Sequence, residues 1–483
     1  MREDCIECTF EDLLDYEQPT NYIVKSTKYC DDYKTPVLTA GKSFIKGYTN
    51  ETDGIFDDLP TIIFDDFTTA TQFVDFEFKV KSSAMKILVP TSKLVNMQFV
   101  YNCIQVNQVR NDTHKRYWIS VYAKKKILLP PLVEQQAILA KTEELFSDLD
   151  NGIANFKKAQ EQLKIYRQAV LKKAFEGGFT VEWRKKHPYS MDTFIKQLKT
   201  EKAVAINAKK IARSDYFPLL SKKDLKYSIP DNWIYLPWKT INSNNKYAMK
   251  RGPFGSALKK EFFVEKGLVV YEQGHAINDD PYRHRYYIPE DKFKELKAFE
   301  VKGGDMIISC SGVTLGRICL LPEDAEIGII NQALLKVDLD EKILLKKYFI
   351  MLFRSETFQR LIFDKSLGSA MPNMVGMSEL KEIAIPIPSI NEQHQIMQEI
   401  ESRLSVCDKV EQSINESLLK AEALRQSILK KAFEGKLLSK AEIEQCKIEA
   451  DYEPASELLK KIKAEKLAKE QELKKKNTKK KTE

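Results

Sequence analysis

The segment RQAVLKKAFEG (167–177) returns almost unchanged as RQSILKKAFEG (425–435). The likeness extends upstream, because residues 127–177 and 385–435 align without a gap at an offset of 258. Two dissimilar sequences, of about 126 and 154 residues, precede the two copies. A chain that repeats one segment behind two unlike ones is built from two similar halves. The sequence therefore predicts a pseudo-symmetric molecule that grips a target with two ends.

Each copy opens on a proline-containing apolar run and continues as one long helical pattern. Pro130 and Pro388 prevent a helix from continuing upstream, and Gly177 and Gly435 occupy C-cap positions. A sustained seven-residue apolar period is typical of a seam against another helix. Since the halves are similar, we expect the two helices to pair with each other, antiparallel. The predicted seam consists of Leu149, Phe156, Leu163 and Val170, with the polar Thr142 in line, and of Ile400, Cys407, Ile414, Ala421 and Ile428.

The sequences outside the helices contain short β-type runs between polar loops, such as TIIFDDF (61–67) and DMIISC (305–310). They favour a mixed α/β (α+β) class: two variable domains with short-stranded sheets and helices, separated by two long helices that pair as an antiparallel coiled coil in a pseudo-two-fold arrangement. The predicted division is 1–133 first domain, 134–177 first long helix, 178–228 basic linker with a short helix, 229–391 second domain, 392–435 second long helix, and 436–483 short helix and lysine-rich tail.

The net charge of +8 comes mostly from the last 24 residues. Residues 460–483 hold eleven lysines and four acids, which leaves about +1 for the rest of the chain. We expect this tail to be disordered. Binding of a polyanion by the globular parts would therefore depend on local basic patches.

The eight cysteines are scattered, which is typical of free thiols in a reducing compartment. Cys5 and Cys8 form one CxxC pair, but no second pair follows at zinc-ribbon spacing, so chance or local packing is the better interpretation. The chain has no apolar run of 18 residues, and its acidic N-terminus lacks an apolar signal core. We expect a cytoplasmic protein.

Catalytic motifs are missing from the sequence. The string DDPY (279–282) lacks the double proline of an amino-methyltransferase loop, and SGVTLGR (311–317) lacks the lysine and spacing of a phosphate loop. The histidines are dispersed without the spacing of metal ligands: His114, His187, His275, His284 and His394. We therefore predict a non-catalytic chain that binds no cofactor or metal of its own.

Three segments carry candidate nucleic-acid contacts, because Arg, Lys and amide side chains pair with base edges while lysines and hydroxyls hold phosphates. Two of them occupy equivalent places just before the repeats. The candidates are Asn107, Gln108, Arg110, Asn111, Lys115 and Arg116 in the first segment, Ser369 and Asn373 in the second, and Lys250, Arg251, Ser256, Lys259 and Lys260 in the third. A solvated charged turn remains the alternative for the first segment. For a fourth, 63–73, we prefer a structural loop, because Asp65 and Asp66 would repel DNA.

This arrangement resembles the specificity subunit of type I restriction-modification systems. The likeness lies in PLVEQ (131–135) and PSINEQ (388–393) after the proline strands, in the repeated helix ends, and in a second domain that opens on IPDNWIYLPW (229–238). Segments 114–132 and 368–388 also resemble the ends of that family's target-recognition domains. The resemblance covers essentially the whole chain.

The resemblance implies a DNA-binding subunit of a phage-defence complex. Each variable domain would be a target-recognition domain that reads one half of a bipartite site in double-stranded DNA. The long helices would set the spacing and dock two methyltransferase (M) subunits, and restriction (R) subunits would join them. S-adenosylmethionine, ATP and Mg would then be bound by the partners. The alternatives are a stand-alone DNA-binding or regulatory protein with a coiled-coil spacer, a protein-binding scaffold, and an autonomous enzyme.

Overall fold

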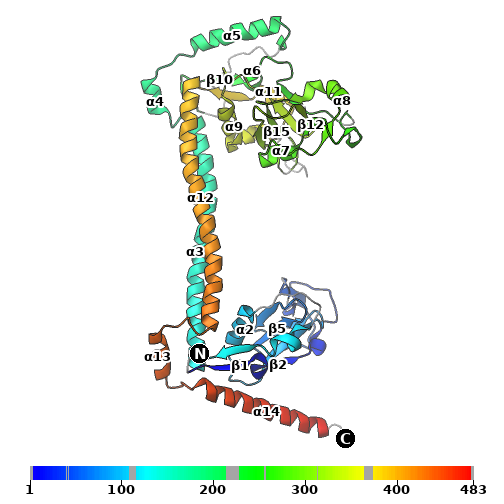
Figure 1. Ribbon diagram of the computed structural model, residues 1–483, viewed down its shortest axis with the longest axis vertical. Helices are drawn as coiled ribbons and strands as arrows, with labels where there is room; N and C mark the ends of the chain where they lie inside the picture. Colours follow the sequence, from blue (N-terminus) through cyan, green and yellow to red (C-terminus); the bar gives the residue numbers. More distant parts are fainter. Residues whose placement is uncertain are drawn as a thin grey trace. The chain divides into compact units, whose positions relative to one another are not determined.

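The computed structural model describes residues 4–39, 41, 43–107, 116–213, 228–254, 257–312, 314–363 and 374–479 (Figure 1). The chain divides into two compact units. Unit 1 comprises Met1–Lys157 with Ile414–Glu483, and unit 2 comprises Lys158–Ser413. Each unit contains one variable domain together with one end of both long helices.

The long helices α3 (Leu132–Phe175) and α12 (Ile390–Phe433) have 44 residues each. In unit 1, Arg425 near the end of α12 forms an ion pair with Asp150 in the first half of α3. In unit 2, Arg167 near the end of α3 binds Asp408 at 2.7 Å and Glu411 at 2.8 Å in the first half of α12. The start of one helix thus meets the end of the other in both units, so the pair is antiparallel (Figure 1).

The positions of the predicted seam differ in burial between the two helices. Those on α12 are all buried: Ile400, Cys407, Ile414, Ala421 and Ile428. On α3, Thr142 and Val170 are buried, whereas Leu149, Phe156 and Leu163 are only partly covered. The apolar period therefore lies on the covered side of α12 and on a less completely covered side of α3.

Both long helices end in the same way. Gly177 has φ 72° and Gly435 has φ 69°, a left-handed conformation that favours glycine. The Gly178 N–H donates to the Lys173 carbonyl at 2.8 Å, and the Lys436 N–H donates to the Lys431 carbonyl at 2.8 Å. These bonds satisfy carbonyls that a helix end leaves without a partner. The predicted C-cap glycines are confirmed.

The domain of unit 1 is built from three small sheets. The strand β1 (Ile6–Thr9) pairs antiparallel with β9 (Lys126–Leu129), which leads into α3. An antiparallel four-stranded sheet has the order β2 (Leu14–Glu17), β8 (Met85–Pro90), β5 (Thr61–Asp65), β6 (Thr71–Val74). A third sheet has the order β4 (Ile45–Thr49), β3 (Thr35–Leu38), β7 (Lys79–Val80). The helix α2 (Met97–Val106) packs its apolar side into the core of this unit.

The domain of unit 2 repeats this plan. The strand β10 (Ile234–Pro237) pairs antiparallel with β19 (Ala384–Ile387), which leads into α12. The four-stranded sheet has the order β11 (Met249–Arg251), β18 (Leu334–Val337), β15 (Met306–Ser309), β16 (Ile318–Leu320). The other sheet has the order β13 (Tyr287–Ile288), β12 (Leu268–Tyr271), β17 (Gly328–Ile330), β14 (Glu300–Val301). The helix α9 (Lys346–Arg354) takes the place of α2.

One further helix packs on each domain. The helix that covers the domain of unit 2 comes after α3 in sequence, and the helix that covers the domain of unit 1 comes after α12. The helix α5 (Asp192–Asn207) packs in unit 2, where the Lys202 ammonium donates to the Asn242 carbonyl at 3.0 Å. The helix α14 (Ala455–Lys479) packs in unit 1, where Lys463 lies 3.1 Å from Asp12. The remaining helices are short: α1 (Phe10–Leu13), α4 (Val181–Lys186), α6 (Trp238–Ile241), α7 (Gln273–Asn278), α8 (Glu290–Glu295), α10 (Glu356–Ile362), α11 (Met377–Glu382) and α13 (Lys440–Ile448).

The predicted mixed α/β class with short-stranded sheets and two long helices is confirmed. The expected disorder of the tail is wrong as far as Lys479, because α14 continues to that residue. Glutamates precede lysines by four places at 465/469 and 470/474, a spacing that stabilises an exposed helix. Across the described residues, no helix is both long and apolar enough to cross a bilayer. The eight cysteines are free thiols.

Candidate nucleic-acid interface

A buried Glu–Gln dipeptide at the start of each long helix anchors the helix to its domain. These residues are Glu134 and Gln135 in unit 1, and Glu392 and Gln393 in unit 2, each at most 1% exposed. The Gln135 amide donates to the Pro130 carbonyl at 2.8 Å, and the Gln393 amide donates to the Pro388 carbonyl at 3.0 Å. The same side chain thus ties the proline strand to the first helical turn in both repeats.

The Glu392 carboxylate is satisfied from three sides within unit 2. One oxygen accepts from the Thr180 hydroxyl and from the Arg184 guanidinium, both at 2.7 Å, and the other accepts from the Trp233 indole at 2.9 Å. A buried carboxylate is stable only with such hydrogen-bonded and charged partners. The network holds α4 and the chain just before β10 against the start of α12.

The loops after β11, β12, β15 and β17 meet at one edge of unit 2, which we term the strand-end edge (residues 251–254, 272–274, 310–312, 314–317 and 331–333). The Gly252 N–H donates to the Leu334 carbonyl at 2.9 Å, and the Cys310 N–H donates to the Ala333 carbonyl at 2.8 Å. The Gln273 amide donates to the Ser311 carbonyl. Backbone bonds between loops therefore fix this edge, which can present side chains on a rigid base.

Arg251 lies at the end of β11, on the strand-end edge. One Nη atom is 3.4 Å from the Cys310 carbonyl oxygen, to which the Met374 N–H also donates at 3.4 Å. Its Nε atom is buried and has no hydrogen-bond partner in the described part of the chain. Arg251 thus meets one end of the predicted segment that carries Ser369 and Asn373, which lie outside the described residues, as does Ser256.

Lys250 is not on the same side of the sheet as Arg251, because successive strand residues point to opposite faces. Its ammonium lies 5.3 Å from the Phe299 ring centroid and 5.8 Å from that of Tyr247. Lys259 and Lys260 are exposed, and Lys259 is 3.4 Å from Glu261. The structure therefore places Lys250 and Arg251 on opposite faces of the sheet, while Lys259 and Lys260 are exposed to solvent.

In unit 1 the structure describes only two of the predicted residues. Gln108, Arg110, Asn111 and Lys115 lie outside the described residues. Asn107 ends α2: its side-chain amide donates to the Cys103 carbonyl at 2.8 Å, while its own carbonyl accepts from Lys125 at 2.8 Å. Its amide is thus engaged in ending the helix and is not turned outward as a reader of bases.

Arg116 is exposed and follows that segment directly. Burial lowers the pKa of the neighbouring Lys86; Asp66, 3.7 Å away, opposes this shift, and the charge of Arg116 adds to it. Lys86 is buried and paired with Asp66, so Arg116 is the exposed cation at this place in unit 1.

The segment 63–73 has the structural role that the sequence favoured. One Asp65 oxygen accepts the Phe67 and Thr68 N–H groups, each at 2.9 Å, and closes the turn between β5 and β6. Asp66 is buried and accepts the Trp118 N–H at 2.8 Å. Both carboxylates are therefore held by backbone groups.

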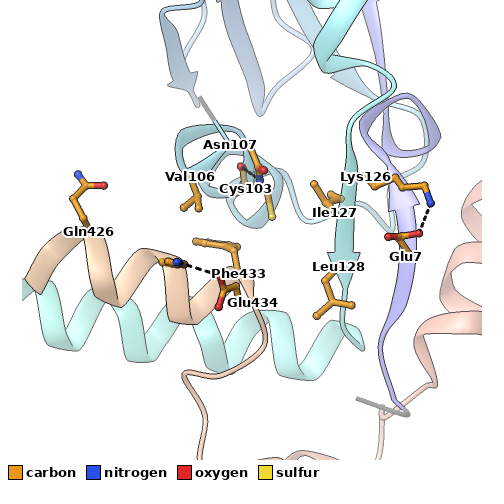
Figure 2. A pocket seen from close by; sticks show the side chains of 11 residues that line it. Glu7, Cys103, Val106, Asn107, Lys126, Ile127, Leu128, Gln426, Phe433 and Glu434 are labelled. Atoms are coloured by element: carbon orange, nitrogen blue, oxygen red, sulfur yellow. Dashed lines mark hydrogen bonds and ion pairs between the residues drawn. The ribbon is translucent and has the colours of Figure 1, made fainter. Parts of the chain in front are cut away.

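A cavity of about 520 Å³ lies where the domain of unit 1 meets the end of α12 (Figure 2). Its walls include Cys103 and Val106 of α2, Ile127 of β9 and Phe433 of α12. Burial raises the pKa of Cys103 well above its ordinary value, so the thiol stays protonated and is a poor nucleophile. The cavity therefore offers packing surface and no activated nucleophile.

Burial likewise raises the pKa of Cys8 to about 12. Among the described residues, no three His, Cys, Asp or Glu side chains gather in a way that could hold a metal ion. The structure thus adds no support for zinc at the Cys5–Cys8 pair.

Two residues of the strand-end edge escaped the sequence analysis, Gln273 and Phe254. Gln273 opens α7, and Phe254 follows Pro253 with 79% of its surface exposed. Phe254 lies in the run Gly-Pro-Phe-Gly (252–255), which is typical of a turn and is flanked by the candidate cations. An aromatic residue within a Gly-Pro turn was the available signal.

A family model described as the type I restriction modification DNA specificity domain matches residues 194–420. Residues 194–420 of this chain thus form a type I restriction-modification specificity domain. The resemblance predicted from the repeats is thereby confirmed. The matched region begins in α5 and ends within α12, so it includes the whole domain of unit 2.

Relatives and a solved structure agree with the family. The EcoR124I/EcoR124II specificity subunit of Escherichia coli is 42% identical over 185 residues, 36% of this chain and 45% of that protein. The EcoBI specificity subunit of Escherichia coli is 28% identical over 342 residues, 70% of this chain and 64% of that protein. The chain thus spans about half to two thirds of these relatives. A chain from a structure of a type I R-M system has the same fold, with a TM-score of 0.59 at 14% identity over 90% of this chain and 99% of that one.

Proposed function

We propose that this chain is the DNA-recognition subunit of a type I restriction-modification complex, and that each variable domain reads one half of a bipartite site in double-stranded DNA. The observation that carries the proposal is the duplicated plan of a chain that contains this domain. Two domains with the same strand order in their four-stranded sheets are each joined to one copy of the repeated helix. Such a pair suits a target with two separate parts, because binding of one domain raises the effective concentration of the other.

We further propose that α3 and α12 set the distance between the two half-sites. A helix of this length spans roughly 66 Å, and the ion pairs of Arg167 and Arg425 link it to its antiparallel partner. The end-to-end distance of a helix pair is nearly fixed, whereas that of a flexible linker with the same number of residues varies widely. The required gap in the DNA site would then follow from helix length.

Methyltransferase subunits are the partners that we assign to the helix pair. Ile165 and Val406 in unit 2 are 70% and 60% exposed, and Leu419 in unit 1 is 72% exposed. Apolar side chains of this size on an exposed helix surface are suited to packing against further helices. Restriction subunits would join through the complex. S-adenosylmethionine, ATP and Mg²⁺ belong to these partners in our proposal, and the complex acts in the cytoplasm.

Domain exchange tests the proposal. Residues 1–126 are replaced by the corresponding domain of another family member, chosen so that an acidic residue still meets Lys463. Modified adenines are then mapped genome-wide in cells that also express the methyltransferase subunit. We expect one half-site to change while the other half and the gap remain. Alteration of both half-sites would contradict independent reading, and methylation without any site preference would contradict DNA recognition by this chain.

A further inference from the structure

Phe254 is the most exposed large apolar side chain in the described part of the protein, at 79%. It belongs to the strand-end edge of unit 2, three residues after Arg251 at the end of β11. A phenylalanine with this exposure does not gain the free energy that burial of its ring would contribute. The position therefore suggests a partner that covers the ring.

The backbone below Phe254 is fixed. Gly252 and Pro253 are buried, and a Cβ atom at position 252 would lie 1.9 Å from the Asn331 carbonyl oxygen, so no other residue fits there. Pro253 restricts its own φ, and the Ala257 N–H donates to the Phe254 carbonyl at 3.3 Å. The ring thus projects from a turn that is attached to the sheet on its N-terminal side.

The surroundings of Phe254 are basic. Residues 246–263 contain four lysines, one arginine and one glutamate, and Lys259 and Lys260 are exposed. Another exposed aromatic residue of this unit, Tyr282, offers a contrast: it is 57% exposed, but its hydroxyl donates to the Asp324 carboxylate at 3.0 Å. An exposed aromatic ring among cations fits a polyanion, whereas a ring held by a carboxylate does not.

We propose that Phe254 is an apolar wedge that inserts between two stacked base pairs of the half-site bound by unit 2. This inference rests on the proposed DNA recognition and names one of its specificity-determining residues. Apolar side chains inserted at a base step unstack it and kink the duplex, while flanking cations hold the phosphates on either side. Because flexible pyrimidine–purine steps open most easily, the wedge selects the step by its deformability.

The test uses the full chain with its methyltransferase partner and duplexes that carry 2-aminopurine. The preferred site is first selected from a random 40-base-pair library with the wild-type complex, and the fluorescent base is then placed at each step of the unit 2 half-site. We expect fluorescence to rise at one step with the wild type and with Phe254→Trp. With Phe254→Ala we expect no rise, and roughly tenfold weaker binding of the selected duplex. Binding of a shuffled duplex should be unchanged.

Tyr282→Ala is the matched control, since it removes another exposed aromatic ring from the same unit and should leave fluorescence and affinity at wild-type values. Equal melting temperatures of the variants would show that folding is intact. If Phe254→Ala retains both the fluorescence rise and the affinity, the wedge is refuted while DNA recognition stands. Loss of methyltransferase binding in Phe254→Ala, with DNA binding intact, would also refute the wedge. If the wild-type complex selects no site at all, the proposed function and the wedge fail together.

Discussion

The two variable domains have the same arrangement of strands and different loops. Both begin and end on a pair of antiparallel strands, β1 with β9 and β10 with β19, and both contain a four-stranded sheet of the same order. The first strands are offset by 228 residues and the last by 258, so the domain of unit 2 is 30 residues longer. Part of the addition is α7, which lies between β12 and β13. The framework positions the loops, and the loops can change without altering it.

The connection of domain to helix shows the same contrast. In unit 2 the Arg184 guanidinium, largely buried, binds the buried Glu392. The residue 258 places after Arg184 is Glu442, in unit 1, whose carboxylate accepts the Ser439 N–H at 2.7 Å and caps α13. The start of α12 in unit 2 is thus held by a buried ion pair. At the position in unit 1 that corresponds to Arg184, the chain has a glutamate instead.

The largest stability difference should come from this position. Arg184→Ala leaves the Glu392 carboxylate buried without its charged partner, which should cost about 3–5 kcal/mol of unfolding free energy. Glu442→Ala removes a capping contact and an exposed ion pair with Lys141, and should cost about 1 kcal/mol. Urea unfolding measures the change in unfolding free energy for each variant. Hydrogen exchange then shows in which unit the change lies. Equal costs for the two variants would contradict the assigned role of the buried pair.

The candidate contacts of the two units can be compared through one arginine in each. Arg116→Ala in unit 1 and Arg251→Ala in unit 2 should each weaken binding of the selected DNA site by about 1–3 kcal/mol if the side chain contacts a base edge. Each variant should relax sequence preference in one half-site only. Site selection with the variant complexes measures this effect. Normal methylation of the original site by both variants would show that neither arginine reads DNA.

The smallest effect is a pH dependence restricted to unit 2. Burial lowers the pKa of His275 below its ordinary value of 6.5; the positive charge of His284 adds to this, and Glu272 and Asp280 oppose it. The neutral ring is therefore favoured by folding. The contribution of this ring to the free energy of unfolding is complete above pH 6.5. It is lost as the pH falls from 6.5 through the lower pKa of the folded state.

His275→Gln removes the titration while a glutamine at this third helical position can still cap α7. We expect the melting temperature of the wild type to fall more steeply below pH 6.5 than that of the variant. Hydrogen exchange should place the difference in unit 2. Parallel pH profiles for the two proteins would contradict burial of a neutral His275.

Much of this architecture could be predicted from the sequence, because the repeat carries its own signals. Proline before each long helix, glycine after it and a seven-residue apolar period are local features, and each has a direct structural consequence. The common strand order of the two domains could not be predicted in this way, because their sequences are dissimilar. Nor could the packing of α14 in unit 1, which places Lys466 against the carbonyl of Glu11, 455 residues away.

The candidate contact residues remain predictions, and the structure shows features of their placement that the sequence does not display. Lys250 and Arg251 are adjacent in sequence, but strand alternation puts them on opposite faces. Asn107 looked like a base reader, but its amide ends a helix. The exposure of Phe254 could not be predicted from the sequence, because the buried turn beneath the ring determines that exposure.

In the function that we propose, helix length sets the gap between two independently read half-sites. Insertion of one seven-residue heptad into each of α3 and α12, after Lys157 and after Ser413, keeps the apolar period and lengthens both helices by roughly 10 Å. Methylated sites are then mapped in cells that express the complex. We expect that the original gap is no longer accepted, and that any site still methylated has a gap about three base pairs longer. Normal methylation at the original gap would contradict this proposal.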